Sequence, residues 1–206
     1  MKNLENLSPS YIIISGDRRN EFKILKELCR EFNGQNKILW FPFTALSRKT
    51  GLSALNSIKL FPDLGINSII FIVGGEYIED DATTEIQEHL QSIGVGIVDI
   101  KPIQEALLIN CRFGNHDIIL FCNISGPETF IEEEIVKLIE LKLGVKIDLL
   151  GNRDRSWKEI IKVKINQVLK EKHTKLEQLM RSTGRNNLER AFPNICVVLR
   201  KIEEDF

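Results

Sequence analysis

The stretch SIIFIVGGEYIEDDATTEIQ, residues 68–87, decides the fold class. Its first six residues are almost all apolar and mostly β-branched, which is typical of a strand buried on both faces of a sheet. A glycine pair follows, then the acids Glu76, Glu79, Asp80 and Asp81, and then a segment with helical periodicity. The stretch therefore predicts a strand that leads directly into a helix, with an acidic junction between them.

The same alternation extends along the chain in both directions. We expect further strands at residues 11–15, 37–41, 95–100, 117–123 and 145–150, and helices at 16–34, 82–94, 102–110 and 127–144. Strands that alternate with helices and are apolar throughout predict an α/β fold, with a mainly parallel sheet flanked by helices. We assign this α/β domain to residues 1–150.

The pattern changes after Gly151. A long charged helix is expected at residues 156–182, and a final helix at 186–206 that breaks near Pro193, with a short strand at 195–199 as an option. Residues 151–206 hold 13 Lys/Arg against 8 Asp/Glu, a net of +5, whereas residues 1–150 hold 15 against 21, a net of −6. We therefore expect a basic helical C-terminal extension that contacts nucleic acid; a solvated helical face is the alternative.

The bulk properties fit an ordinary globular protein. The chain has 206 residues, of which 43% are hydrophobic and 28% charged. No apolar run approaches the roughly 20 residues that cross a bilayer, and the first ten residues lack an apolar signal core. The four cysteines are scattered without a CxxC pair. We expect a cytoplasmic protein with no membrane partner.

The acidic junction is the best candidate for chemistry, because ligands bind at the carboxyl ends of parallel strands. Glu76, Asp80 and Asp81 are candidate ligands of Mg²⁺ or Mn²⁺, which prefer carboxylate oxygens. Glu76 and Asp17 are the candidate catalytic residues. In the alternative interpretation, Asp80 or Asp81 simply caps the following helix, and no cofactor is needed.

Candidate phosphate contacts lie at two places. Arg18 and Arg19 follow the first strand in a turn that could also be an ordinary helix cap. The others belong to the C-terminal extension: Arg153, Arg155, Arg181 and Arg185. No P-loop, GxSxG or HExxH motif is present, so we expect neither a P-loop nucleotidase, a serine hydrolase of that type nor a zinc hydrolase.

The order of YIIISGDRRNEF (residues 11–22) and SIIFIVGGEYIEDD (68–81) resembles the Toprim domain of topoisomerases, primases and OLD-type nucleases. The resemblance implies adjacent parallel strands whose ends share one rim, with a glutamate for acid–base chemistry and an Asp-x-Asp pair for Mg²⁺. Ser15 stands in the place of that glutamate and Gly74 in the place of the first aspartate, so only Glu76 keeps an acid.

These departures favour a catalytically inactive or altered Toprim-like protein that associates with nucleic acid. Three alternatives remain open from the sequence. One is a Mg²⁺- or Mn²⁺-dependent phosphoryl-transfer enzyme with displaced acids, and another is a module for a small phosphorylated ligand. The third is a non-catalytic interaction subunit that forms a homo-oligomer or binds a protein partner.

Overall fold

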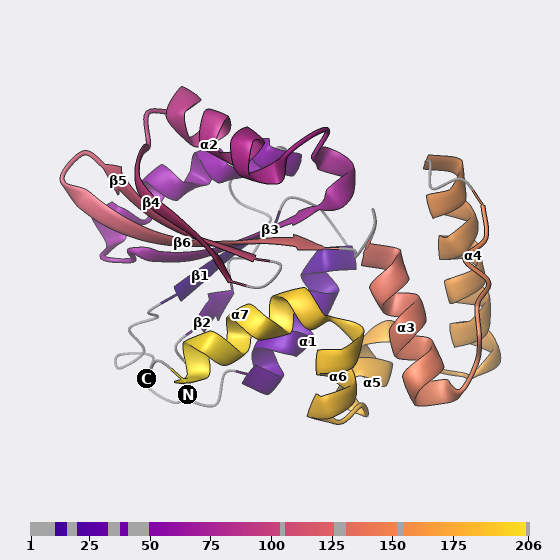
Figure 1. Ribbon diagram of the computed structural model, residues 1–206. Coiled ribbons are helices and arrows are strands. Elements are labelled where there is room, and N and C mark those ends of the chain that lie inside the picture. The colour runs from indigo at the N-terminus through magenta and orange to yellow at the C-terminus, as the bar shows by residue number, and fades with distance from the viewer. Residues whose placement is uncertain are drawn as a thin grey trace.

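The computed structural model describes residues 11–15, 20–32, 38–40, 50–103, 106–125, 131–151 and 155–204, without side chains at 20–22, 38–40 and 155. The described residues form an α/β fold around a six-stranded sheet with the order β2-β1-β3-β6-β5-β4 (Figure 1). The strands are β1 (Tyr11–Ser15), β2 (Ile38–Trp40), β3 (Ser68–Gly74), β4 (Gly96–Ile103), β5 (Ala106–Phe113) and β6 (His116–Ser125).

The centre of the sheet is parallel, as the sequence predicts. β1 pairs in parallel with both β2 and β3, and β3 pairs in parallel with β6. Ile70, in the middle of β3, is completely buried between Ile13 and Phe121 on its two neighbours. Ser15 is aligned with Ile72, so the carboxyl ends of β1 and β3 lie side by side and the expected shared rim is confirmed.

The other half of the sheet is antiparallel, which corrects one prediction. The helix expected at residues 102–110 is wrong: β4, β5 and β6 form an antiparallel meander there. Gly114 and Asn115 connect β5 to β6, and Gly114 has a φ of 57°, the backbone conformation that tight hairpin turns require. The two-residue turn fixes β5 as a strand next to β6, and the sheet is therefore mixed.

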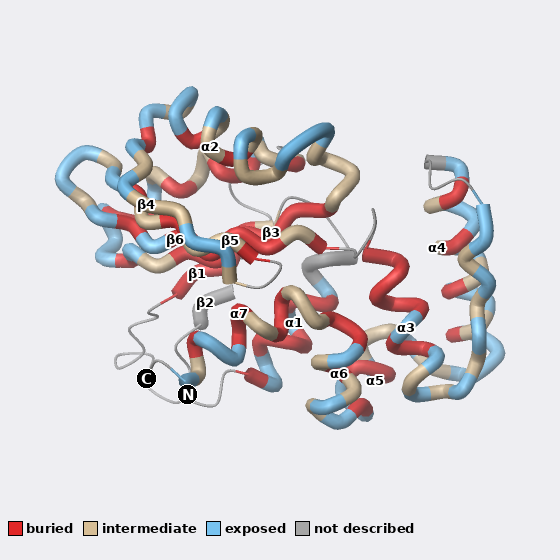
Figure 2. Tube along the Cα trace, viewed as in Figure 1, coloured by how far each residue is buried: buried red, intermediate tan, exposed pale blue. Residues whose placement is uncertain are grey.

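Helices cover both faces of the sheet (Figure 1). The 3₁₀ helix η2 (Gly51–Leu60) and α2 (Ala82–Ser92) lie on one face, and α1 (Asn20–Phe32) and α7 (Pro193–Glu204) lie on the other. α3 (Ile131–Leu143), α4 (Arg155–Glu171), α5 (Leu176–Arg181) and α6 (Arg185–Ala191) extend the second layer beyond the sheet. Exposed residues line the outer sides of α2 and α4, as Figure 2 shows.

The C-terminal part is helical as expected, but three details differ. The single helix expected at residues 156–182 is divided into α4 and α5, and the strand option at 195–199 is wrong because these residues belong to α7. The strand expected at 145–150 is also wrong, because these residues pair with no strand in the described part of the chain. Instead, Lys164 Nζ and Trp157 Nε1 on α4 donate to the carbonyl oxygens of Asp148 and Leu149, at 3.1 and 3.2 Å.

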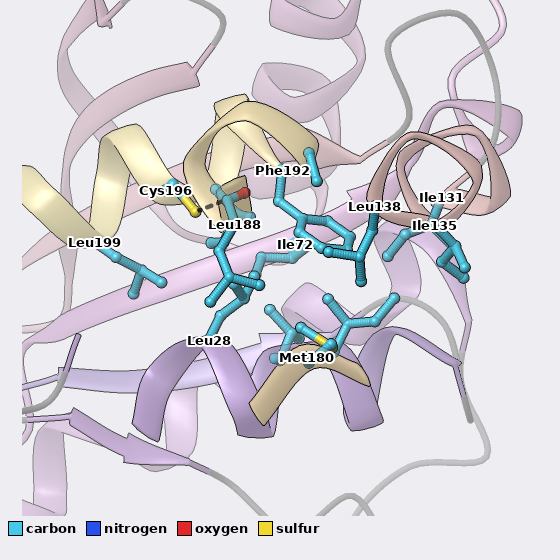
Figure 3. Packing of buried hydrophobic residues seen from close by; sticks show 14 of the residues in the cluster. Leu28, Ile72, Ile131, Ile135, Leu138, Met180, Leu188, Phe192, Cys196 and Leu199 are labelled. Atoms are coloured by element: carbon cyan, nitrogen blue, oxygen red, sulfur yellow. Dashed lines mark hydrogen bonds between the residues drawn. The ribbon is translucent and has the colours of Figure 1, made fainter. Parts of the chain in front are cut away.

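One hydrophobic core joins the C-terminal helices to the sheet. Phe192 is completely buried, and Figure 3 shows its ring among Ile72 of β3, Leu138 of α3 and Leu188 of α6. Cys196 of α7 lies beside Leu188 and is 3.8 Å from its carbonyl oxygen. A domain boundary near residue 150 remains a prediction. Unfolding experiments can test it, because the residues on either side share one core. No helix among the described residues combines the length and apolar character needed to cross a bilayer.

Candidate functional site

Glu76 lies directly behind the carboxyl end of β3, on the rim that β1 and β3 share. It is the middle residue of the short 3₁₀ turn η4 (Gly75–Tyr77). Its carboxylate folds back over Gly74, so that a methyl group at position 74 would collide with it. The side chain is only 18% exposed. Gly74 therefore cannot carry an acid without displacing the carboxylate of Glu76.

The other acids of the junction serve the start of α2. Asp81 is the N-cap, and its carboxylate accepts from the backbone N–H and the hydroxyl of Thr84, both at 2.8 Å. These hydrogen bonds lower the pKa of Asp81. The Glu85 carboxylate accepts the backbone N–H groups of Glu79 and Asp80, both at 2.6 Å. The alternative of a helix cap is confirmed for Asp81.

The candidate metal ligands are not brought together. Within the described ranges, no group of three Asp, Glu, His or Cys side chains is arranged to hold a metal ion. Asp80 and Asp81 are exposed at the start of α2, whereas Glu76 is turned in toward the sheet. A metal site on Glu76, Asp80 and Asp81 remains a prediction without geometric support. The second catalytic candidate, Asp17, lies outside the described residues.

The partner of Glu76 comes from the C-terminal helices. The Lys158 ammonium of α4 donates to Glu76 Oε1, and Lys158 is itself only 13% exposed. The same ammonium lies 3.9 Å from Glu132 Oε2, in the first turn of α3. Lys162, one helical turn further along α4, lies 3.9 Å from Glu132 Oε1 and 2.9 Å from Glu159. One ammonium is therefore shared by the half-buried carboxylate of Glu76 and the buried carboxylate of Glu132.

Burial and charge oppose each other at Glu132. The residue is completely buried, and this desolvation raises the pKa of its carboxyl group against the opposing effect of Lys158 and Lys162. Its place in the first turn of α3 favours the ionised form, because a helix N-terminus carries partial positive charge. Two lysines and a helix N-terminus thus compensate a carboxylate that water does not reach.

Asn123 is a further polar residue at this rim. It is 1% exposed on β6, and neither polar atom of its amide has a hydrogen-bond partner in the part of the chain that the structure describes. It is aligned with Ile72, and Gly74 is aligned with Ser125 two residues later. Alternate residues share a face, so Asn123 lies on the same face as the folded-back carboxylate of Glu76. Buried amides are nearly always hydrogen-bonded, which makes Asn123 exceptional.

Two of the candidate phosphate contacts form internal ion pairs. Arg181 makes a two-bond fork to the buried carboxylate of Glu27, at 2.7 and 2.8 Å, and the bonds to Arg181 lower the pKa of Glu27. Arg185 pairs with Glu203 and Glu189, and its guanidinium lies 4.2 Å from the centre of the Phe32 ring. Both arginines therefore fasten α5 and α6 to neighbouring helices.

The remaining arginine candidates cannot be placed. Arg18, Arg19 and Arg153 lie outside the described residues, and the Arg155 side chain does too.

A different basic surface lies at the far end of α4. Lys170, Lys172 and Lys175, which we call the basic turn, are exposed and make no ion pair with a carboxylate in the described chain.

Sequence reasoning missed Lys158, Glu132 and Asn123. Lys158 directly follows Trp157, the first residue of the buried stripe Trp157, Ile161, Ile165 and Leu169, and this position beside an apolar stripe was an available signal. For Glu132 and Asn123 the signal was weaker, because acids are common in first helical turns and β6 reads as an ordinary buried strand. Comparison with protein-family models, curated proteins and solved structures finds no match to this chain.

Proposed function

We propose that this chain is a Toprim-like protein without metal-dependent catalysis that associates with nucleic acid through its C-terminal helices. The position of Lys158 is the observation that supports the absence of metal-dependent catalysis. Metal-dependent phosphoryl transfer needs carboxylates that bind a divalent cation and leave it open positions for phosphate oxygens. Two acids at the strand rim, the half-buried Glu76 and the buried Glu132, already share the ammonium of Lys158.

The positions around Glu76 support the same proposal. Ser15 provides no carboxylate at the end of β1, and Gly74 leaves the space into which Glu76 folds. A divalent cation at this rim would have to displace the ammonium of Lys158, whose side chain is 13% exposed and bonded to the carboxylate of Glu76, which is 18% exposed. Separating such a pair leaves uncompensated buried charge, which costs about 3–5 kcal/mol.

A nuclease assay tests the catalytic half. Single- and double-stranded DNA and RNA are incubated with the protein in Mg²⁺ or Mn²⁺, with Glu76→Gln as the matched variant. We expect no cleavage above that of the variant. Metal-dependent cleavage that Glu76→Gln removes would contradict the proposal and favour the phosphoryl-transfer enzyme.

The basic turn supports the nucleic-acid half. Lys170, Lys172 and Lys175 are exposed within six residues of chain and form no ion pair with a carboxylate in the described region. Lysines in this state contact phosphates and release condensed counterions, so that binding weakens as salt rises. Arg181 and Arg185 contribute less, because internal acids already hold them.

Salt-dependent binding to a labelled single strand tests this half. Replacing the three lysines of the basic turn by alanine should reduce the slope of log K against log salt by about 2–3, because each phosphate contact contributes roughly 0.7–0.9. The control removes the same charge from exposed lysines elsewhere, at Lys101, Lys137 and Lys146. Equal losses in both triple variants would contradict a localised contact. Binding that does not change with salt would contradict nucleic-acid association altogether.

A further inference from the structure

The residues at the strand rim do not fit the metal that the Toprim resemblance implies. That metal would be held by an Asp-x-Asp pair at the end of β3, where this chain has Gly74 and Glu76. Position 74 cannot supply the missing ligand while Glu76 covers it. The disagreement is therefore built into the packing of the rim and is more than a missing side chain.

A different set of ligands surrounds the position of the Lys158 ammonium. Glu76 from the end of β3 and Glu132 from the start of α3 approach it from two elements that are 56 positions apart in the chain. Such an arrangement of carboxylates around one positive charge is what a hard cation requires. Lys158 reaches this position because Trp157, its neighbour on α4, is buried and donates to the carbonyl oxygen of Leu149.

Asn123 is an independent sign of a polar ligand on the same face of the sheet. Its amide is 99% buried, has no hydrogen-bond partner in the described chain, and lies on the sheet face that the Glu76 carboxylate covers. One oxygen of Glu76, Oε2, is likewise buried without a hydrogen bond among the described residues. A carboxamide oxygen is a normal ligand of a hard cation, and that of Asn123 is not used by a hydrogen bond in the described chain.

We propose that Lys158 is the resident cation of this rim: its ammonium is held by Glu76 and Glu132. Once that ammonium is removed, a divalent cation binds to the same two carboxylates, with the unpartnered amide of Asn123 on the same sheet face as a further ligand. The inference rests on the proposed function in one respect, since both require Lys158 to hold the buried acids. It goes further by naming Glu132 and Asn123 as ligands, and by predicting that the wild-type protein does not respond to divalent metal.

Mn²⁺ binding to the full-length chain tests the inference without any activity assay. Electron paramagnetic resonance measures free Mn²⁺, and thermal unfolding measures stabilisation. We expect wild type and Lys158→Arg to leave the Mn²⁺ signal unchanged. Lys158→Met should bind about one equivalent, and 10 mM MnCl₂ should raise its melting temperature by about 3 °C or more if the dissociation constant is near 1 mM.

Two further variants identify the site. Lys164→Met removes a lysine from the same helix whose one hydrogen bond among the described residues is to a backbone carbonyl, so this variant should bind no Mn²⁺. The double variant Lys158→Met/Glu76→Gln should lose the binding that Lys158→Met gains. Equal binding by Lys164→Met and Lys158→Met, or binding that survives the loss of Glu76, would overturn the proposal.

The remaining outcomes depend on whether Lys158→Met folds. If Lys158→Met is unfolded in buffer, Mn²⁺ should restore its circular dichroism spectrum where NaCl of equal ionic strength does not. Failure of Mn²⁺ either to bind or to refold both Lys158→Met and Lys158→Ala overturns the inference. The proposed function fails separately, through metal-dependent cleavage by the wild type, so the two failures can be distinguished.

Discussion

Replacing Phe192 by alanine tests whether the C-terminal helices are part of the α/β core. The Phe192 side chain is completely buried at the junction of the sheet with α3 and α6 (Figure 3). A buried phenylalanine removes roughly 150–250 Å² from water, worth about 4–6 kcal/mol as an upper limit at about 25 cal/mol per Å². Measured Phe→Ala changes in cores cost about 3–5 kcal/mol. We expect that loss here, out of a total stability of about 5–15 kcal/mol.

Urea unfolding followed by far-UV circular dichroism and by tryptophan fluorescence is the assay. A Trp40→Phe background leaves Trp157 of α4 as the fluorescent reporter, while the dichroism reports on the whole fold. Both signals should shift together in Phe192→Ala, with a melting temperature lower by about 6–20 °C. Val163→Ala, at a position 65% exposed on α4, is the control and should change stability by less than about 0.5 kcal/mol.

A loss below about 1 kcal/mol would refute the assignment of Phe192 to a shared core. Two separate transitions, with the sheet signal unchanged by the substitution, would refute it as well and would support independent units on either side of residue 150. A single transition would show that the C-terminal helices and the sheet unfold as one cooperative unit.

Three further substitutions test other parts of the structure. Arg181→Gln should destabilise the protein at pH 7, because Arg181 holds the folded-state pKa of Glu27 below its ordinary value of 4.5. The difference in stability from wild type should shrink as the pH falls below 4.5, and a constant difference across pH would contradict this pairing. Burial raises the pKa of Glu132 above its ordinary value of 4.5, so wild-type stability should fall as the pH rises from 4.5 through the pKa of the folded state. In urea unfolding measured from about pH 4 to 8, Glu132→Gln should flatten this dependence of stability on pH. Gly114→Ala should destabilise the protein by about 1–2 kcal/mol through backbone strain alone, because φ is 57° and a methyl group there meets no neighbour. Gly96→Ala on β4 is the control and should destabilise the protein less; equal losses of stability would contradict the hairpin geometry.

The parallel half of the fold could be predicted because its signals are local. β1 and β3 are continuous β-branched runs, and Asp81 stands three residues before the Thr84 amide that it caps. The antiparallel half was less accessible, because residues 102–110 suit either a helix or a strand until the turn at Gly114 and Asn115 is taken into account. That dipeptide was the available hairpin signal.

The contents of the strand rim could not be predicted from the sequence for a physical reason. Glu76 was identified because it follows β3 directly, but its partner Lys158 is 82 residues away on a helix that reaches the rim only through tertiary packing. Two arginines of the C-terminal extension have internal partners that the sequence did not reveal. The number of arginines suggested a phosphate-binding surface, yet Arg181 and Arg185 are held by acids from α1, α6 and α7, which sequence patterns do not pair.

Anomalous diffraction from wild-type crystals soaked in MnCl₂ is the most direct test of the central claim, that Lys158 takes the position of a metal ion. The account predicts the Lys158 ammonium between Glu76 and Glu132, with no anomalous peak at that position. A manganese peak about 2.1 Å from the carboxylate oxygens of Glu76, with Lys158 turned away, would contradict it.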